Sequence, residues 1–206
     1  DGSTQDQFAE TSWNNLKTAL PLSLTANNAN IENVTMRDWY GNGMRFFNYH
    51  NVNINNVIIS NVGGHWYQNN GYDAFGDAFS FSGHSDEANV NISNVIAKGK
   101  YKDSTLSRIG VAFDFASNKT DTVTNVNINN CDFINYDRGI HVESILGKIN
   151  IVYNNGRCVN NVFLFNYGNN PTQVYFTGDN LVLDYHDGSY NGSKGIYNSI
   201  FNIYNS

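Results

Sequence analysis

The sequence predicts an all-β chain folded as a parallel β-helix, a single-stranded solenoid of about 23 residues per rung. A phrase of alternating Asn and apolar residues recurs along the chain, Asn fills 37 of the 206 positions, and charged residues make up only 15%. Asn disfavours helix interiors and favours turns. A β pattern that repeats at intervals of a few tens of residues is typical of a solenoid, because one repeat cannot bury its apolar face alone.

The recurring phrase sets the length of the repeat. Clear copies begin at Asn51, Asn89 and Asn125, and weaker copies begin at Asn28 and Lys148. The spacings between these first residues are 23, 38, 36 and 23. We therefore expect a base period of about 23 residues, with inserts of about 15 and about 13 residues in two neighbouring rungs.

The chain divides into a cap, residues 1–27, and a β-helix, residues 28–206. Residues 4–20 are the one helix candidate, since Phe8, Leu16 and Leu20 form an apolar stripe at helical spacing. A short amphipathic helix at this position would cover the open end of the first sheet, which would otherwise invite edge-to-edge aggregation.

Each rung is predicted to contain three strands. The first strand alternates apolar and polar residues, so one face is buried. A turn Asn follows, because Asn tolerates the left-handed conformation better than other residues with a Cβ atom. The predicted turn residues are Asn33, Asn56, Asn94 and Asn130, which we expect to form a ladder. The third strands are Met44–Phe47, Phe79–Ser82, Phe113–Ala116 and Ile140–Glu143.

Charge and cysteine content exclude several classes of function. The formal net charge of −6 and the pI near 5.2 argue against nucleic acid as a partner. No apolar run reaches the roughly 18 residues that a membrane-spanning helix needs, so no membrane insertion is predicted. Cys131 and Cys158 are separated by about one rung, and we expect two buried thiols rather than a disulfide.

The two inserts are where binding residues are expected. They cover residues 63–76 and 98–109, between the second and third strands of neighbouring rungs, so their loops should lie side by side. Aromatic rings interleaved with polar groups suit carbohydrate, because sugar C–H faces stack on rings. The predicted substrate-binding residues of the inserts are His65, Trp66, Tyr67, Tyr72, Asp73 and Tyr101.

The outward face of the third strands carries the candidate catalytic residues. The alignment places Asp114 beside His141 in one outward column and Glu143 in the next. Asp114 and Glu143 then lie on a diagonal of about 8 Å, as the spacings of a β-sheet dictate. Inverting glycosidases hold two carboxyl groups about 6.5–9.5 Å apart, so this pair is predicted to supply the acid and the base. The charge state of His141 would raise or lower the pKa values of Asp114 and Glu143.

Other charged residues give alternative or supporting roles. Asp77 follows the first insert and is a further catalytic candidate, alone or paired with Asp73. Arg138 could hold an anionic sugar or stabilise charge in an elimination. Asp73, Asp77 and Asp103 could bind calcium, but they lack the ordered spacing of a calcium loop, so no cofactor is predicted.

The repeated Asn-Val-Asn-Ile phrase, the turn Asn ladder and the opening Asp1-Gly2-Ser3-Thr4-Gln5-Asp6 resemble the pectin-lyase-like superfamily. Within it, they resemble bacteriophage tailspikes and pre-neck appendages that degrade or bind host polysaccharide. Gln5 stands where that family's opening has the first of two acidic residues. The resemblance implies a right-handed β-helix, a homotrimer, other virion tail proteins as partners, and a virion or extracellular location. Because the family has no universal catalytic motif, the resemblance assigns no catalytic residue in this chain.

The expected function is therefore to bind, and to degrade by hydrolysis, a host cell-surface polysaccharide. Two alternatives remain. A non-catalytic receptor-binding or structural module of a phage tail would bind glycan without turnover. A secreted bacterial polysaccharide lyase would cleave by elimination and would require calcium.

Overall fold

The computed structural model describes most of the predicted β region. The described residues are 22–25, 27–39, 42–62, 64–68, 71–75, 77–83, 87–99, 101–102, 105–114, 122–143, 147–159, 162–167, 172–184 and 201–203. The predicted helix at 4–20 lies outside these ranges. Within them every regular element is a strand, which confirms the all-β prediction.

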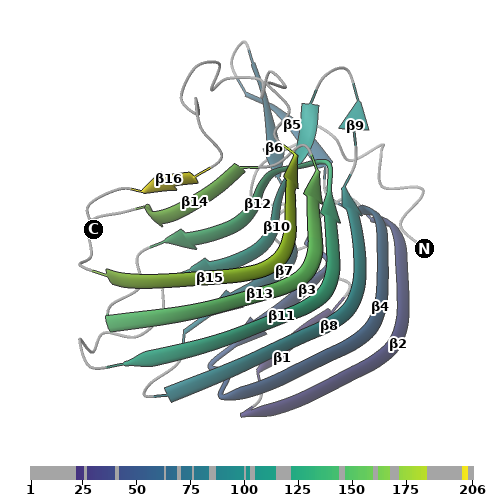
Figure 1. Ribbon diagram of the computed structural model, residues 1–206. Coiled ribbons are helices and arrows are strands. Elements are labelled where there is room, and N and C mark those ends of the chain that lie inside the picture. Colours follow the sequence, from purple (N-terminus) through teal and green to yellow (C-terminus); the bar gives the residue numbers. More distant parts are fainter. Residues whose placement is uncertain are drawn as a thin grey trace.

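A six-stranded parallel sheet is built from the long strands, each of which bends sharply near its middle (Figure 1). This bent strand joins the predicted first and second strands of a repeat into one element. The sheet order is β15-β13-β11-β8-β4-β2. Its members are β2 (Asn28–Trp39), β4 (Asn51–Val62), β8 (Glu87–Gly99), β11 (Val123–Ile134), β13 (Gly147–Val159) and β15 (Thr172–Asp184).

The short strands form a second sheet, parallel except for one small strand. Its main order is β1-β3-β7-β10-β12-β14-β16, and β9 (Tyr101–Lys102) pairs antiparallel with β10. The strand β1 lies within the predicted cap region, so the sheet begins before residue 28. The parallel members are β1 (Leu22–Thr25), β3 (Met44–Phe47), β7 (Asp77–Ser82), β10 (Thr105–Asp114), β12 (Tyr136–Glu143), β14 (Val162–Tyr167) and β16 (Phe201–Ile203).

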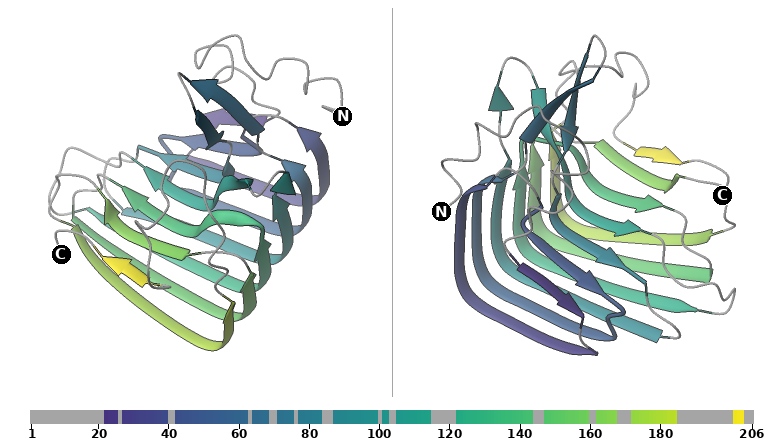
Figure 2. Two further views of the ribbon diagram at one scale, coloured as in Figure 1. Left: turned by 90° about the horizontal axis from the view of Figure 1, so that it is seen from above. Right: turned by 180° about the vertical axis from the view of Figure 1, so that it is seen from behind.

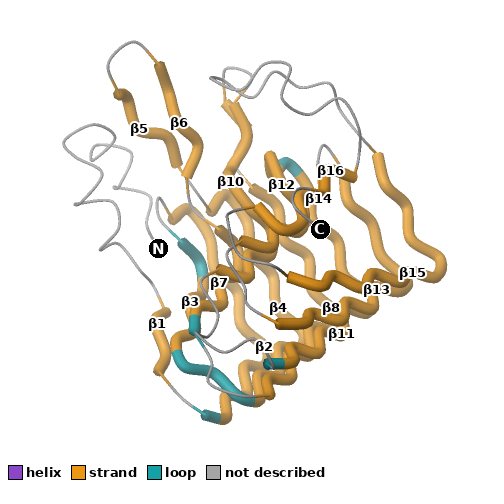
Figure 3. Tube along the Cα trace, turned by 90° about the vertical axis from the view of Figure 1, so that its left-hand side faces the viewer, coloured by secondary structure: helices purple, strands orange, loops and turns teal. Residues whose placement is uncertain are grey.

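From β2 onward the chain alternates between the two sheets, a long strand being followed by a short one, so that each repeat adds one strand to each sheet (Figure 2). The hairpin formed by β5 (Gly64–Gln68) and β6 (Gly71–Phe75) interrupts this alternation between β4 and β7. It projects away from both sheets (Figure 3).

The core lies between the two sheets and repeats from strand to strand. Phe46, Phe81 and Phe113 stack in one column, with ring centroids 5.0 and 5.1 Å apart. Each comes from a different short strand, and each is fully buried. Stacked rings are favourable beyond the area that they bury, so this column fixes the alignment of neighbouring repeats.

Asn residues make the corners of the long strands, as predicted. The corner residues Asn33, Asn56, Asn94 and Asn130 have φ angles between 53 and 58°. The same conformation recurs in the later repeats at Asn155 and Asn180. Side-chain amides also bond from repeat to repeat, with 2.6 Å between Asn56 Nδ2 and Asn33 Oδ1. A ladder on the outer face joins Asn28, Asn51, Asn89, Asn125 and Asn150 through bonds of 2.8–3.2 Å.

The register differs from the sequence alignment in two places, each by two residues. Phe81 pairs with Phe113 and Phe79 with Val111, whereas the alignment set Phe79 beside Phe113. Similarly, Asn125 pairs with Asn150 rather than with Lys148, so that spacing is 25 residues instead of 23. A slip of two residues keeps every side chain on its own face, so the alternation of apolar and polar residues cannot detect it.

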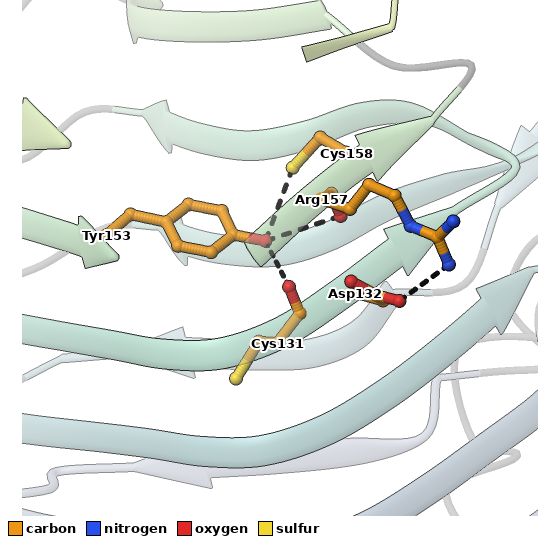
Figure 4. A network of polar contacts seen from close by, with 5 residues as sticks. All are labelled: Cys131, Asp132, Tyr153, Arg157 and Cys158. Carbon is orange, nitrogen blue, oxygen red and sulfur yellow. Dashed lines mark hydrogen bonds and ion pairs between the residues drawn. The ribbon is translucent and has the colours of Figure 1, made fainter. Parts of the chain in front are cut away.

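The two cysteines are buried free thiols, as predicted. The Cys158 Sγ atom lies 3.5 Å from the hydroxyl of Tyr153, which donates to the backbone carbonyl of Cys131 at 2.7 Å (Figure 4). The Cys131 thiol contacts the carbonyls of Ile92 and Asn129 instead. Burial raises the pKa of both thiols to about 12. Thiols that stay protonated in this way are structural groups rather than nucleophiles.

Candidate functional site

The first insert is an antiparallel hairpin that contacts β10. Its register pairs Trp66 with Asp73 and Tyr67 with Tyr72, and His65 precedes Trp66 on β5. Tyr101 of the second insert lies in β9, which also pairs with β10. Both inserts therefore contact β10, and the predicted second insert includes the first residues of that strand, from Thr105. That the two loops lie side by side stays a prediction. The side chains of these residues and the whole of Asp103 lie outside the described part of the chain.

The outward positions of the short strands form two parallel rows. Because Phe46, Phe81 and Phe113 point into the core, the positions on either side of them face outward. We call them the His141 row and the Glu143 row. From β3 to β12 the His141 row consists of Arg45, Ser80, Ala112 and His141, and the Glu143 row consists of Phe47, Ser82, Asp114 and Glu143. On β1, Ser23 and Thr25 continue the two rows beside Arg45 and Phe47.

The middle and the far end of the His141 row are covered although they face away from the core. Ser80 is 2% exposed, and Ala112 and His141 are 0% exposed. The outer face of this sheet is thus not open to solvent at this level. In the neighbouring row Glu143 keeps 20% of its side chain exposed, whereas Ser82 is 9% exposed, so this row is open to solvent at Glu143.

His141 and Glu143 are joined directly across these two rows. The Nε2 atom of His141 lies 2.8 Å from Oε2 of Glu143. The two residues are two apart on β12, which places both side chains on one face. A buried imidazole bonded to a partly exposed carboxylate is an arrangement that can hold or move a proton.

Asp114 is a neighbour of Glu143 rather than of His141, which corrects the predicted diagonal. Its backbone pairs in register with Glu143 on one side and with Ser82 on the other. Adjacent strands lie about 4.8 Å apart, whereas the diagonal was expected to be about 8 Å. The predicted column that joined Asp114 to His141 is wrong because the strand is shifted by two residues; Ala112 takes that place. The side chain of Asp114 lies outside the described part.

Asp77 and Arg138 do not belong to either outer row. Asp77 alternates with Phe79 and Phe81, is 2% exposed, and donates its backbone N–H to Asn42 Oδ1 at 2.9 Å. Arg138 alternates with the core residue Ile140, and its Nε atom is buried. Burial raises the pKa of Tyr136, and the charge of Asp77 raises it further, so Asp77 lies close to a core tyrosine.

Two polar residues beside the predicted site were not among the candidates. Ser82 precedes Asp114 in the Glu143 row, and Arg45 precedes Ser80 in the His141 row. The signal that marks them is the one that marked Glu143, namely an outward position on a short strand. Among the described residues no group of three or more His, Cys, Asp or Glu could hold a metal ion. Asp103 lies outside these residues, so the calcium site of Asp73, Asp77 and Asp103 stays a prediction.

Comparison with protein-family models, with curated proteins and with solved structures found no match. In the described ranges no helix is long and apolar enough to cross a membrane.

Proposed function

We propose that the chain is a right-handed parallel β-helix of the pectin-lyase-like kind that binds a host cell-surface polysaccharide and cleaves it by hydrolysis. The site is the Glu143 row, at the carboxyl ends of β3, β7, β10 and β12. The observation that carries the proposal is the 2.8 Å contact between His141 and Glu143, with Asp114 in register on the next strand.

The register changes the expected stereochemistry of the reaction. Retaining glycosidases hold their two carboxyl groups about 5–5.5 Å apart, and inverting ones about 6.5–9.5 Å apart. Neighbouring positions on adjacent strands lie about 4.8 Å apart, which favours the retaining arrangement. Asp114 would act as one member of the acid and nucleophile pair and Glu143 as the other, with His141 holding the Glu143 carboxylate in place.

The setting that fits this activity is the tail of a virion or another extracellular site. A homotrimer that contacts other tail proteins would present several copies of the site to one polysaccharide, which increases avidity when single sites are weak. These partners belong to the proposal.

The reaction is tested by incubating the protein with preparations of capsular and lipopolysaccharide glycans and measuring newly formed reducing ends. Wild type should release them, and Glu143→Gln and Asp114→Asn should each lower the rate at least a hundredfold, because each removes a group that transfers a proton or attacks the sugar. The anomer that is released first should have the configuration of the substrate.

The matched control is Asp132→Asn, the same chemical change on the other sheet. Asp132 pairs with Arg157 at 2.8 Å in an exposed ion pair, so its loss should leave turnover unchanged. Unchanged cleavage by both Glu143→Gln and Asp114→Asn would remove the proposed pair. Unsaturated products that disappear with a chelator would instead indicate a calcium-dependent lyase.

A binding module without turnover is the second candidate, and the burial of the His141 row favours it. A catalytic site needs access for its substrate, whereas Ser80 and His141 are 2% and 0% exposed. This alternative predicts glycan binding with no release of reducing ends by wild type.

A further inference from the structure

Arg45 lies on β3 in the His141 row, between Ser23 of β1 and Ser80 of β7, and has no ion-pair partner among the described residues. Its guanidinium carbon lies 4.4 Å from the centroid of the Phe47 ring, two residues further along β3. The Nε atom is buried and has no hydrogen-bond partner in the described ranges, while the residue as a whole stays partly exposed. A guanidinium that stacks on a ring keeps its planar edge available to an anion.

Ser82 gives a second polar group without a partner on the same face. It lies in register with Phe47, is 9% exposed, and its Oγ atom is buried with no hydrogen-bond partner in the part of the chain that the structure describes. A buried hydroxyl that lacks a partner is costly, so a ligand group that accepts its hydrogen bond would bind favourably. Arg45 and Ser82 thus flank Phe47 on two adjacent strands.

Phe47 and Ser82 belong to the same row as the proposed catalytic pair, and Arg45 lies beside that row. The strand order β3-β7-β10-β12 carries Phe47, Ser82, Asp114 and Glu143 in sequence. Arg45 is therefore three strands from Glu143, or roughly 14 Å at the usual strand spacing. An extended chain that crosses the strands could contact Arg45 while another of its units reaches Glu143.

We propose that Arg45, Phe47 and Ser82 form a subsite for an anionic group of the polysaccharide, a carboxylate or a sulfate or phosphate ester, so that the substrate is an acidic glycan. This inference rests on the proposed function and names its substrate class. The guanidinium would bind the anion through two parallel hydrogen bonds, the Ser82 hydroxyl would donate a third, and the Phe47 ring would hold the guanidinium in place. Since the net charge of the chain is −6, attraction of an anionic polymer needs a local cation of this kind.

The test measures binding in the Glu143→Gln background, so that cleavage does not interfere. Calorimetric titration uses polygalacturonate, dextran sulfate and neutral dextran. The anionic polymers should bind more tightly than dextran, and added salt should lower the affinity of the protein for them. Arg45→Met should lower that affinity about tenfold to a hundredfold, the range expected for a charged hydrogen-bonded pair, and Arg45→Lys should restore part of it. Preference for polygalacturonate would assign a carboxylate, and preference for dextran sulfate an ester.

The controls separate binding from folding. Arg37→Met removes an exposed arginine from β2 in the other sheet and should change nothing. Ser82→Ala should weaken binding without lowering the unfolding temperature, because the hydroxyl that it removes has no partner among the described residues. Equal binding of the three polymers, or no binding of an anionic polymer that depends on Arg45, would overturn the inference.

The outcomes also distinguish this inference from the proposed function. Cleavage of a neutral glycan that depends on Glu143 would overturn the acidic-glycan subsite and leave the hydrolase standing. Binding of an anionic polymer that depends on Arg45, without any cleavage by wild type, would leave the subsite standing and overturn the hydrolase.

Discussion

At the scale of single residues, the clearest chemistry is the burial of groups that must stay neutral. The Cys131 carbonyl and the Cys158 thiol lie around the Tyr153 hydroxyl, which donates to backbone carbonyls and contacts Cys158 Sγ. Burial is the main reason that the pKa of Tyr153 is raised. A neutral cluster of this kind stabilises the fold only while its members keep their protons.

We therefore expect stability to fall as the pH rises above 9. The pKa of each thiol is raised from 9.0 to about 12 in the folded protein, so between these values the unfolded chain loses protons that the folded chain keeps. Between these two pKa values each thiol should lower the free energy of unfolding by about 1.4 kcal/mol per pH unit. Below pH 9 both states keep the proton, so the stabilisation from the neutral thiol is fully present there. Urea unfolding at pH 8, 9 and 10 measures the slope.

The double variant Cys131→Ala/Cys158→Ala is the comparison. Its slope between pH 9 and 10 should be shallower than that of wild type, because tyrosines begin to titrate only near pH 10, their ordinary value. An identical slope in the two proteins would show that the thiols do not carry the effect.

At the scale of elements, one residue type gives each long strand its bend and its bond to the next strand. The corner residue Asn56 has a φ of 53° and donates to Asn33. Only Gly adopts this conformation more readily, and Gly has no side chain to make the bond. Asn is thus the residue that satisfies both demands at a corner.

Substitutions at Asn56 should separate these two roles. Asn56→Gly removes the amide bond and keeps the conformation, so it should cost about 1 kcal/mol. Asn56→Ala also strains the backbone and should cost roughly 1–2 kcal/mol more. Urea unfolding of the two variants measures both values, and equal losses would show that the backbone conformation contributes nothing.

The alternation of side chains along a strand, with a period of two residues, decides how much of the fold the sequence predicts. Alternation identified the buried faces, and the Asn turns identified the corners, because both are local properties. The register of β10 could not be obtained in this way, since Val111 and Phe113 serve the core as well as Phe113 and Phe115 would. The burial of His141 was also beyond reach, because an outward position on a strand does not reveal whether anything packs against it.

At the scale of the whole molecule, the repeats separate a constant framework from a variable insert. The spacing is 23 residues from Asn28 to Asn51 and 38 from Asn51 to Asn89, yet the strands on either side stay in register. The extra residues include the β5-β6 hairpin, which lies outside both sheets (Figure 3). Function can therefore vary at the insert without change to the framework.

Deletion of Gly64–Phe75 tests this separation. The shortened chain should unfold in one cooperative step and keep its strand signal in circular dichroism, because shorter loops cost little to close. It should lose polysaccharide binding together with Trp66, Tyr67 and Tyr72. Aggregation or loss of cooperative unfolding would instead make the hairpin part of the framework.

The outer Asn ladder also gives the molecule a direction. Every bond from Asn28 to Asn150 runs the same way, with the later residue donating its amide hydrogen to the earlier one. The dipoles of these amides therefore add along the axis, and within the described ranges the row ends in unused donors at Asn28 and in an unused acceptor at Asn150. A segment that extends the row beyond Asn28 must offer an acceptor oxygen, and a segment that extends it beyond Asn150 must offer an N–H donor. Two copies of the row can therefore bond head to tail, whereas two copies that meet head to head cannot.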